Sequence, residues 1–326
     1  MEANTRVAIV GYGNLGKGVE TALGLAPDLE LVGVFSRRDP LSVATLGAPV
    51  FALSELDESR DDIDVLILCG GSKSDLPVQT PELASRFTLV DSFDTHAKIP
   101  EHFAAVDQAA RAAGTTAVIS SGWDPGLFSL QRMFGEAILP EGRTYTFWGQ
   151  GLSQGHSDAL RRIDGVRLAV QYTIPSEEAI EQVRSGSRPE LTARQQHVRD
   201  CYVVLEEGAD EAAIREAIVT MPDYFEPYDT TVHVITEEVF ERDHQGMPHG
   251  GFVIRSGESS PGMQQTMEFQ LTLGSNPEFT SSVLVAYARA AAKLARSGDH
   301  GAKTVYDIAP GLLSPKSPAQ LRAELL

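Results

Sequence analysis

The feature that most constrains this chain is an apolar run that leads directly into a glycine-rich turn. Residues 6–10 form the run, and residues 11–16 read Gly-Tyr-Gly-Asn-Leu-Gly, a G-x-G-x-x-G pattern. A helical pattern follows, with Leu15, Val19 and Leu23 on one face. The glycines let the backbone turn tightly and approach a pyrophosphate, whose charge then lies at the positive end of the helix. This segment is typical of a strand–turn–helix unit that binds a dinucleotide.

The end of the next strand indicates which dinucleotide is bound. Residues 29–35 form a second apolar run, and an NAD-binding unit would place Asp or Glu about 20 residues after the last glycine to bind the ribose 2′-hydroxyl. This chain instead has Ser36, Arg37 and Arg38. A carboxylate would repel a 2′-phosphate, whereas a hydroxyl and two guanidinium groups would bind one. The sequence therefore predicts NADP(H), in preference to the alternative that both arginines are merely solvated loop charges.

Short apolar runs alternate with helical segments over the first part of the chain. Residues 64–69, 87–90 and 116–120 predict further strands, and residues 99–114 predict a helix that stops at a glycine. This alternation predicts an α/β fold, a Rossmann-type parallel sheet with helices on both faces. Ligands of such sheets bind beyond the carboxyl ends of the strands. The predicted cofactor-binding residues belong to the glycine-rich turn and to the segments after the strands: Gly11, Tyr12, Gly13, Asn14, Leu15, Ser36, Arg37, Arg38, Cys69, Gly70, Gly71, Ser72, Ser92, Phe93, Asp94, Ser121, Gly122, Trp123, Asp124 and Pro125.

The pattern changes in the second part of the chain, where longer strands are predicted in an open mixed or antiparallel sheet. Asn276 and Pro277 then begin a long helix as N-cap and first helical residue. We expect two domains: residues 1–121, to which residues 277–326 return, bind the dinucleotide. Residues 122–276 form a second α+β domain for substrate binding and dimerisation. The strands predicted in this second domain are residues 145–148, 166–172, 201–205, 230–235 and 267–273.

Composition excludes several classes of protein. The formal net charge of −18 argues against nucleic-acid and anionic-membrane partners, because both require a basic surface. No apolar stretch approaches the roughly 18 residues of a membrane span, and no signal peptide is visible. Cys69 and Cys201 lie far apart without metal-type spacing, which indicates reduced thiols in a cytoplasmic protein. No cluster of His, Cys, Asp or Glu has the spacing of a metal site.

Two carboxylates are the main candidates for chemistry. Asp94 and Asp124 each follow a predicted strand end, on the cofactor side of the sheet. Together they could hold an ammonium group or exchange protons with an amine or imine nitrogen. The alternatives are a turn residue for Asp94 and a helix N-cap before Pro125 for Asp124. Their shared position beside a nucleotide-binding turn favours function.

Other polar residues are ambiguous by spacing alone. The glycine-rich segment 149–158 could offer backbone N–H groups to an anion, or could simply be a flexible connection. Arg199 could be a surface charge, His249 an exposed turn residue, and Asn276 only the N-cap described above. None of these residues is assigned to a site from spacing.

Several motifs together resemble the meso-diaminopimelate dehydrogenase family. They are the turn at residues 11–16, Phe-Ser-Arg-Arg at 35–38, Ser-Gly-Trp-Asp-Pro-Gly at 121–126, Gly-Leu-Ser-Gln-Gly-His-Ser-Asp-Ala-Leu-Arg-Arg at 151–162, Met-Pro-Asp-Tyr-Phe at 221–225 and Gly-Met-Pro-His-Gly-Gly at 246–251. The resemblance extends from the first strand to residues 312–315. It implies a homodimeric, NADP-dependent enzyme that deaminates the D-centre of meso-2,6-diaminopimelate to L-2-amino-6-oxopimelate and ammonia, or runs the reverse reductive amination, in lysine and peptidoglycan-precursor synthesis.

The resemblance also implies roles for individual residues. Asp94 and Asp124 would face the amino group of the D-centre, with Trp148 as the adjacent wall. Gln154 and Gly155 would receive the neighbouring carboxylate. The residues implied for the distal L-amino-acid end are Thr173, Arg199, His249 and Asn276. The general base stays open between Asp94, Asp124 and a water between them, with His156 as a weaker candidate.

Two other functions are compatible with the nucleotide-binding half. One is another NADP-dependent reductase of amino-acid metabolism, such as a dihydrodipicolinate or homoserine enzyme. The other is a non-catalytic NADP-binding sensor, which would bind the cofactor without turnover. The motifs at residues 121–126 and 246–251 argue against the first, and the many polar side chains after strand ends argue against the second.

Overall fold

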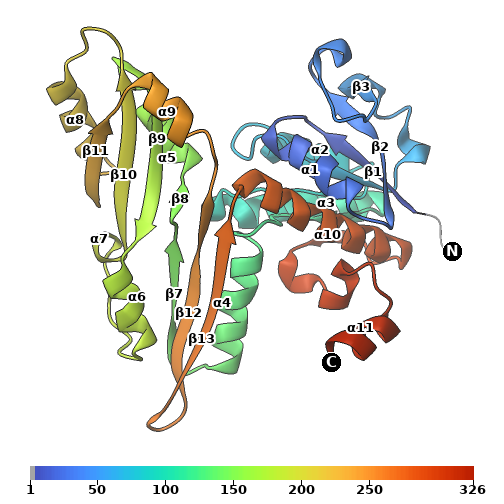
Figure 1. The fold of residues 1–326 in the computed structure, drawn as a ribbon. Coiled ribbons are helices and arrows are strands. Elements are labelled where there is room, and N and C mark those ends of the chain that lie inside the picture. Colours follow the sequence, from blue (N-terminus) through green and yellow to red (C-terminus); the bar gives the residue numbers. More distant parts are fainter. Residues whose placement is uncertain (1–3) are drawn as a thin grey trace. The chain divides into compact units, whose positions relative to one another are not determined.

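The computed structural model describes residues 4–326, which divide into two compact units (Figure 1). The first unit comprises Met1–Leu130 with Pro277–Leu326, and the second comprises Gln131–Asn276. The chain leaves the first unit within α4 (Leu127–Ile138), whose Leu127 and Leu130 pack against the core of that unit, and it returns between Asn276 and Pro277. The expected domain boundary at residues 121/122 lies just before this helix.

The first unit contains one seven-stranded sheet with the order β14-β6-β5-β4-β1-β2-β3. Every neighbouring pair is parallel. The strand order reverses at β1, so the nucleotide-binding turn after β1 lies at the switch point where such sheets bind ligands. The strands are β1 (Thr5–Val10), β2 (Leu29–Ser36), β3 (Val50–Ala52), β4 (Val65–Leu68), β5 (Leu89–Val90), β6 (Thr116–Val118) and β14 (Gly301–Lys303).

Helices cover both faces of this sheet, which confirms the predicted fold class. Successive residues of β1 alternate between two cores, because side chains in a strand point to opposite faces. Val7 and Ile9 enter the core under α1 and α10, and Ala8 and Val10 enter the core under α2 and α3. The helices are α1 (Asn14–Gly24), α2 (Leu76–Ala84), α3 (Ile99–Ala113), α10 (Asn276–Arg296) and α11 (Pro318–Leu325).

The second unit contains two sheets where the sequence predicts a single one. A four-stranded sheet has the order β11-β10-β9-β8, and a three-stranded sheet has the order β13-β12-β7. The first is mixed, because β10 and β11 pair in parallel, and the second is antiparallel throughout. The strands are β7 (Gly142–Trp148), β8 (Gly151–Leu152), β9 (Val166–Pro175), β10 (His197–Leu205), β11 (Asp229–Val234), β12 (His249–Ser260) and β13 (Met263–Leu273).

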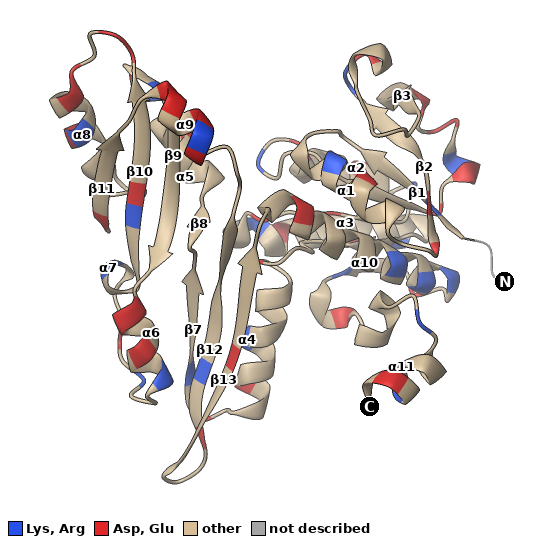
Figure 2. Ribbon diagram, in the orientation of Figure 1, with Lys and Arg blue, Asp and Glu red and all other residues tan. Residues whose placement is uncertain are grey.

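Short helices complete the second unit. Figure 2 shows acidic residues on three of them, α6, α8 and α9. These acidic residues include first-turn residues of each helix, where the helix dipole favours negative charge. No helix among residues 4–326 is long and apolar enough to cross a membrane. The helices are α5 (Gln154–Leu160), α6 (Glu177–Arg184), α7 (Ala193–Gln196), α8 (Glu211–Val219) and α9 (Glu237–Asp243).

Candidate active site

The glycine-rich turn in the first unit has the geometry of a pyrophosphate cradle. Gly11 has a φ of +91°, a conformation that favours glycine. A Cβ on Gly16 would lie 2.5 Å from the Gly11 carbonyl oxygen, so this turn requires glycine at position 16. Gly13 caps α1 without a side-chain hydrogen bond, and a Cβ on it would meet nothing within 4 Å. The open start of α1 can therefore receive a phosphate group.

The residues predicted to bind a 2′-phosphate lie beside this turn. The Arg38 guanidinium donates to the carbonyl oxygen of Tyr12, and the Arg38 N–H donates to Ser36 Oγ at 3.1 Å. Arg37 pairs with Asp75 at 2.8 Å, and Asp75 also accepts from the Gly71 N–H at 2.8 Å. The Arg37–Asp75 ion pair thus connects the segments after β2 and β4. The Arg38 guanidinium lies against the glycine-rich turn, and the Arg37 guanidinium lies beside the loop after β4. This donor set fits a phosphorylated ribose.

The two candidate carboxylates lie on loops at the carboxyl ends of β5 and β6. The Asp94 N–H donates to Ser72 Oγ at 2.8 Å, which joins its loop to the one after β4. Asp94 is exposed and Asp124 is partly buried. Gly126 closes the Asp124 loop tightly, since a Cβ on it would lie 1.8 Å from the Gly122 carbonyl oxygen.

Asp124 and Asn276 do not lie at the N-cap positions that the sequence predicted as alternatives. The helix after Asp124 begins at Leu127, so Gly126, not Asp124, precedes it. Asn276 is the first residue of α10, one position inside the expected cap, and its N–H donates to the Met247 carbonyl oxygen at 2.9 Å. Neither residue therefore occupies the position directly before its helix.

Arg199 is the most unusual residue of the second unit. It lies on β10 opposite Thr173 of β9, and its side chain donates to Thr173 Oγ1. Its guanidinium carbon lies 3.8 Å from the centroid of the Tyr228 ring, and the residue is only 6% exposed. Its Nε has no partner, and no Asp or Glu of the described chain pairs with it. A buried cation without a counter-ion is costly and indicates a site for an anionic ligand. Tyr228 was not predicted, because it has no local pattern that links it to Arg199.

Burial and this cation keep two nearby histidines neutral. Desolvation, followed by the charge of Arg199, lowers the pKa of His156 to about 4 and the pKa of His197 to about 4. The Nε2 atom of His197 accepts from the Trp148 N–H at 2.9 Å, and the two rings stack with centroids 5.7 Å apart. His197 therefore holds Trp148 in place, and Trp148, which is 39% exposed, can serve as a wall.

The segment around Met247 connects three other predicted residues. Gln154 Nε2 donates to Met247 Sδ at 3.6 Å, and Asn276 binds the Met247 carbonyl as described. His249 packs on Gly151, and a Cβ added to Gly151 would lie 2.5 Å from Cγ of His249. A Cβ on Gly155 would meet nothing within 4 Å, so the start of α5 is open. The structure thus places Gln154, His249 and Asn276 around one segment, and Arg199 with Thr173 on the adjoining strands β10 and β9.

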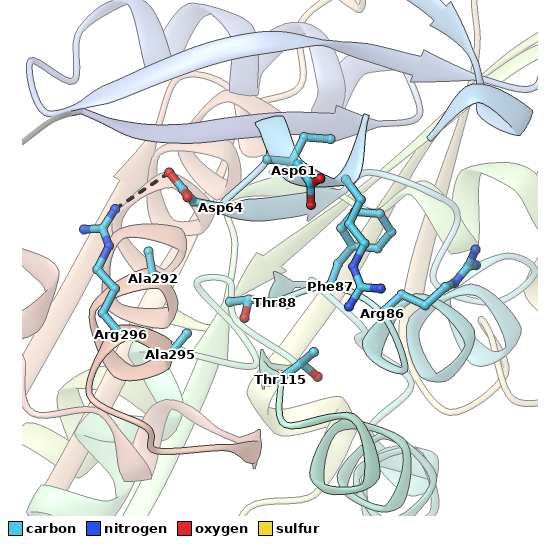
Figure 3. A pocket seen from close by; sticks show the side chains of 11 residues that line it. Asp61, Asp64, Arg86, Phe87, Thr88, Thr115, Ala292, Ala295 and Arg296 are labelled. Atoms are coloured by element: carbon cyan, nitrogen blue, oxygen red, sulfur yellow. Dashed lines mark ion pairs between the residues drawn. The ribbon is translucent and has the colours of Figure 1, made fainter. Parts of the chain in front are cut away.

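A cavity of 330 Å³ lies at the opposite edge of the first unit's sheet, near the amino ends of the strands (Figure 3). Two of its three arginines are paired: Arg86 binds Asp57 and Glu82, and Arg296 lies 3.7 Å from Asp64. None of the residues predicted to bind cofactor or substrate lines this cavity. Residues 4–326 hold no group of three His, Cys, Asp or Glu that could bind a metal ion.

Comparisons with known proteins agree along nearly the whole chain. Residues 122–275 match the family model of the diaminopimelic acid dehydrogenase C-terminal domain. The meso-diaminopimelate D-dehydrogenase of Lysinibacillus sphaericus is 63% identical over 322 residues, which are 98% of this chain and 99% of that protein. An engineered D-amino acid dehydrogenase bound to NADP+ is 47% identical, with a TM-score of 0.87 over 99% of this chain and 100% of that one.

A third similar protein is a mutant meso-diaminopimelate dehydrogenase of Clostridium tetani E88, solved with DAP. It is 53% identical, with a TM-score of 0.95 over 99% of this chain and 100% of that one. It carries the substitutions Q154L, T173I, R199M, P248S, H249N and N276S. At these six numbers the present chain has the unsubstituted residues, and all except Pro248 are among those predicted above to bind substrate.

Proposed function

The chain belongs to the meso-diaminopimelate D-dehydrogenase family, and we propose that it deaminates the D-centre of meso-2,6-diaminopimelate with NADP+ as oxidant. The products are L-2-amino-6-oxopimelate and ammonia, and the reverse reaction is a reductive amination. The observation that carries the proposal is the buried guanidinium of Arg199, which has no counter-ion in the described chain. A substrate with two carboxylates and two ammonium groups supplies the missing anion.

NADP(H) is the cofactor, and the first unit has the groups that hold it. The open start of α1 binds the pyrophosphate, and Arg37 and Arg38 bind the 2′-phosphate. When bound, NADP+ takes up the hydride that the D-centre carbon loses. The residues that follow β4, β5 and β6 complete the set: Cys69, Gly70, Gly71, Ser72, Ser92, Phe93, Asp94, Ser121, Gly122, Trp123, Asp124 and Pro125.

Asp94 and Asp124 serve the reacting amino group. As carboxylates they hold the D-centre ammonium and take up its proton, so that a neutral amine can form the carbon–nitrogen double bond. Water then adds to that carbon and ammonia leaves. Trp148 forms an apolar wall, which its exposed ring and the support of His197 favour.

The second unit binds the remaining polar groups of the substrate. Gln154 and the open backbone at Gly155 receive the carboxylate of the reacting centre. Arg199 binds the distal carboxylate, with Thr173 beside it. His249 and Asn276 complete the distal site, and five of the six substitutions in the Clostridium tetani protein fall at residues assigned here to substrate.

We further propose that the enzyme is a cytoplasmic homodimer. Two free cysteines suit a reducing compartment. Strand β13 is an edge strand with mostly exposed or half-buried residues, and such an edge favours pairing with or cover by a second copy. In function, residues 1–121 and 277–326 serve the cofactor, while residues 122–276 serve substrate and dimer contacts, in agreement with the start of the family match at residue 122.

The proposal is tested by incubating the protein with NADP+ and meso-diaminopimelate. NADPH and ammonia should appear in equal amounts. A non-catalytic sensor would bind NADP+ without forming NADPH. A dihydrodipicolinate or homoserine enzyme would oxidise NADPH with its own substrate and ignore meso-diaminopimelate.

A further inference from the structure

Asp91 is a buried carboxylate at the end of β5 that the proposed reaction does not use. It has no exposed surface. Its Oδ1 accepts from the backbone N–H of Phe93 at 3.0 Å and of Ser120 at 2.8 Å. Its Oδ2 lies 2.8 Å from Thr80 Oγ1 and 2.8 Å from His102 Nε2. Contacts from four segments of the chain therefore converge on one carboxylate.

These contacts join the loops that carry Asp94 and Asp124. The ladder between β5 and β6 ends at Val90 and its partner residue. Beyond that point the Asp91 carbonyl oxygen accepts from the Ser121 N–H at 3.0 Å and from Ser121 Oγ at 2.9 Å. Asp91 thus continues the connection between the two strands after their regular pairing stops.

Ser120 requires such a partner because its backbone is strained. Its φ is +54°, in the left-handed region that residues with a Cβ rarely adopt. The bond from its N–H to Asp91 holds it there. On the other loop, the Phe93 ring stacks on His102 with centroids 4.2 Å apart. A buried carboxylate whose two oxygens each take part in two hydrogen bonds favours one conformation for both loops.

We propose that Asp91, supported by His102, is a positioning residue that sets Asp94 and Asp124 for the deamination. This inference rests on the proposed function. Neither Asp91 nor His102 touches the substrate; both act through the backbone of the two loops. A displacement of about 1 Å at reacting groups can lower a rate by about 10²-fold, so loss of this connection should be visible in kcat.

Two substitutions of Asp91 separate hydrogen bonding from charge. Asp91→Ala leaves the N–H groups of Phe93 and Ser120 without an acceptor. Asp91→Asn keeps an oxygen for both, and its amide can donate to Thr80 and to the other tautomer of His102. We expect Asp91→Ala to lower kcat by about 10²-fold and Asp91→Asn to stay within about fivefold of the parent.

The controls keep this effect apart from a loss of folding. The melting temperature of Asp91→Asn should change little. So should its affinity for 2′-phospho-ADP-ribose, a ligand that probes the 2′-phosphate site at Arg37 and Arg38. Asp64→Asn is the matched control, because Asp64 accepts a backbone N–H at the other edge of the same sheet, 2.7 Å from the Arg6 nitrogen. It should leave kcat unchanged.

If Asp91→Ala does not fold, His102→Phe replaces it. Phe keeps the stack on Phe93 but removes the donor to Asp91, and kcat should fall by at least about fivefold. A kcat within about twofold of the parent in His102→Phe, or within about threefold in folded Asp91→Ala, would overturn the inference. So would an Asp91→Asn enzyme as slow as Asp91→Ala. An unmodified protein that fails to reduce NADP+ with meso-diaminopimelate would instead refute the proposed function itself.

Discussion

Replacing Arg199 by Met should separate substrate binding from stability. Arg199 is 6% exposed, and its guanidinium contacts the Thr173 hydroxyl and Tyr228, with no Asp or Glu of residues 4–326 paired with it. A charge-assisted bond to a substrate carboxylate in such a place contributes up to about 3 kcal/mol. Since about 1.4 kcal/mol corresponds to a factor of ten, kcat/KM for meso-diaminopimelate should fall by about 10²-fold.

The same substitution should not lower the melting temperature of the free enzyme. Burial lowers the pKa of Arg199, which is the direction expected for a buried cation that no carboxylate of residues 4–326 neutralises. Met keeps the apolar stem and removes an uncompensated buried cation, so the loss of one hydrogen bond and one ring contact is offset.

Arg255 offers a matched control in the same unit. It is also 6% exposed, but its guanidinium donates to the carbonyl oxygens of Leu139 and Pro140 and to Thr144 Oγ1. Arg255→Met should therefore lower the melting temperature and leave kcat/KM of the folded enzyme near normal.

Initial rates of NADPH formation give kcat/KM, and titration of protein fluorescence with NADP+ gives its affinity. Thermal unfolding gives the melting temperature. NADP+ affinity should be unchanged in both variants. An Arg199→Met enzyme with near-normal kcat/KM, or one destabilised as much as Arg255→Met, would refute this account of Arg199.

Three further predictions address the cofactor, acid stability and assembly. Replacing Arg37 and Arg38 together by Ala should raise KM for NADP+ at least about tenfold and narrow the gap with NAD+ in steady-state assays, because each charge-assisted bond contributes roughly 1.5–3 kcal/mol; an unchanged preference would place the 2′-phosphate elsewhere. The pKa of His197 is lowered to about 4 in the folded protein, so the unfolded chain binds more protons between the ordinary histidine value and pH 4. His197 should thus lower the free energy of unfolding by about 2 kcal/mol between pH 7 and pH 5. Urea unfolding of His197→Gln at the two pH values should lack this part of the pH dependence. Light scattering at micromolar concentration should give the mass of a dimer; a monomer mass would contradict the proposed assembly.

The nucleotide-binding half was largely predictable because its signals are local. A glycine-rich turn, apolar runs and a helix stop such as Gly114 each determine structure within a few residues. The short strand β14 (Gly301–Lys303) was missed, since three residues that pair with β6 carry no periodic pattern of their own. The division of the second unit into two sheets was missed for a related reason: strand pattern does not specify which strands pair.

For the candidate site too, local sequence signals do not predict which residues distant in the chain come into contact. The positions of Asp94 and Asp124 after β5 and β6 could be predicted, because the preceding apolar runs are local signals. The environment of Arg199 could not, because Thr173 and Tyr228 approach it only through strand pairing and a distant loop. Asp91 resembled an ordinary residue at a strand end, and its role depends on contacts with Thr80, His102 and Ser120, which only the folded sheet brings together.

The central claim is that this chain oxidises the D-centre of meso-diaminopimelate, with its distal L-end held by the Arg199 site. The most direct measurement compares the meso and L,L isomers as substrates, by absorbance of NADPH under identical conditions. The meso compound should be oxidised, with one ammonia released per NADPH, and the L,L isomer should give no turnover because it has no D-centre. Robust oxidation of the L,L isomer, or none of the meso compound, would contradict the account.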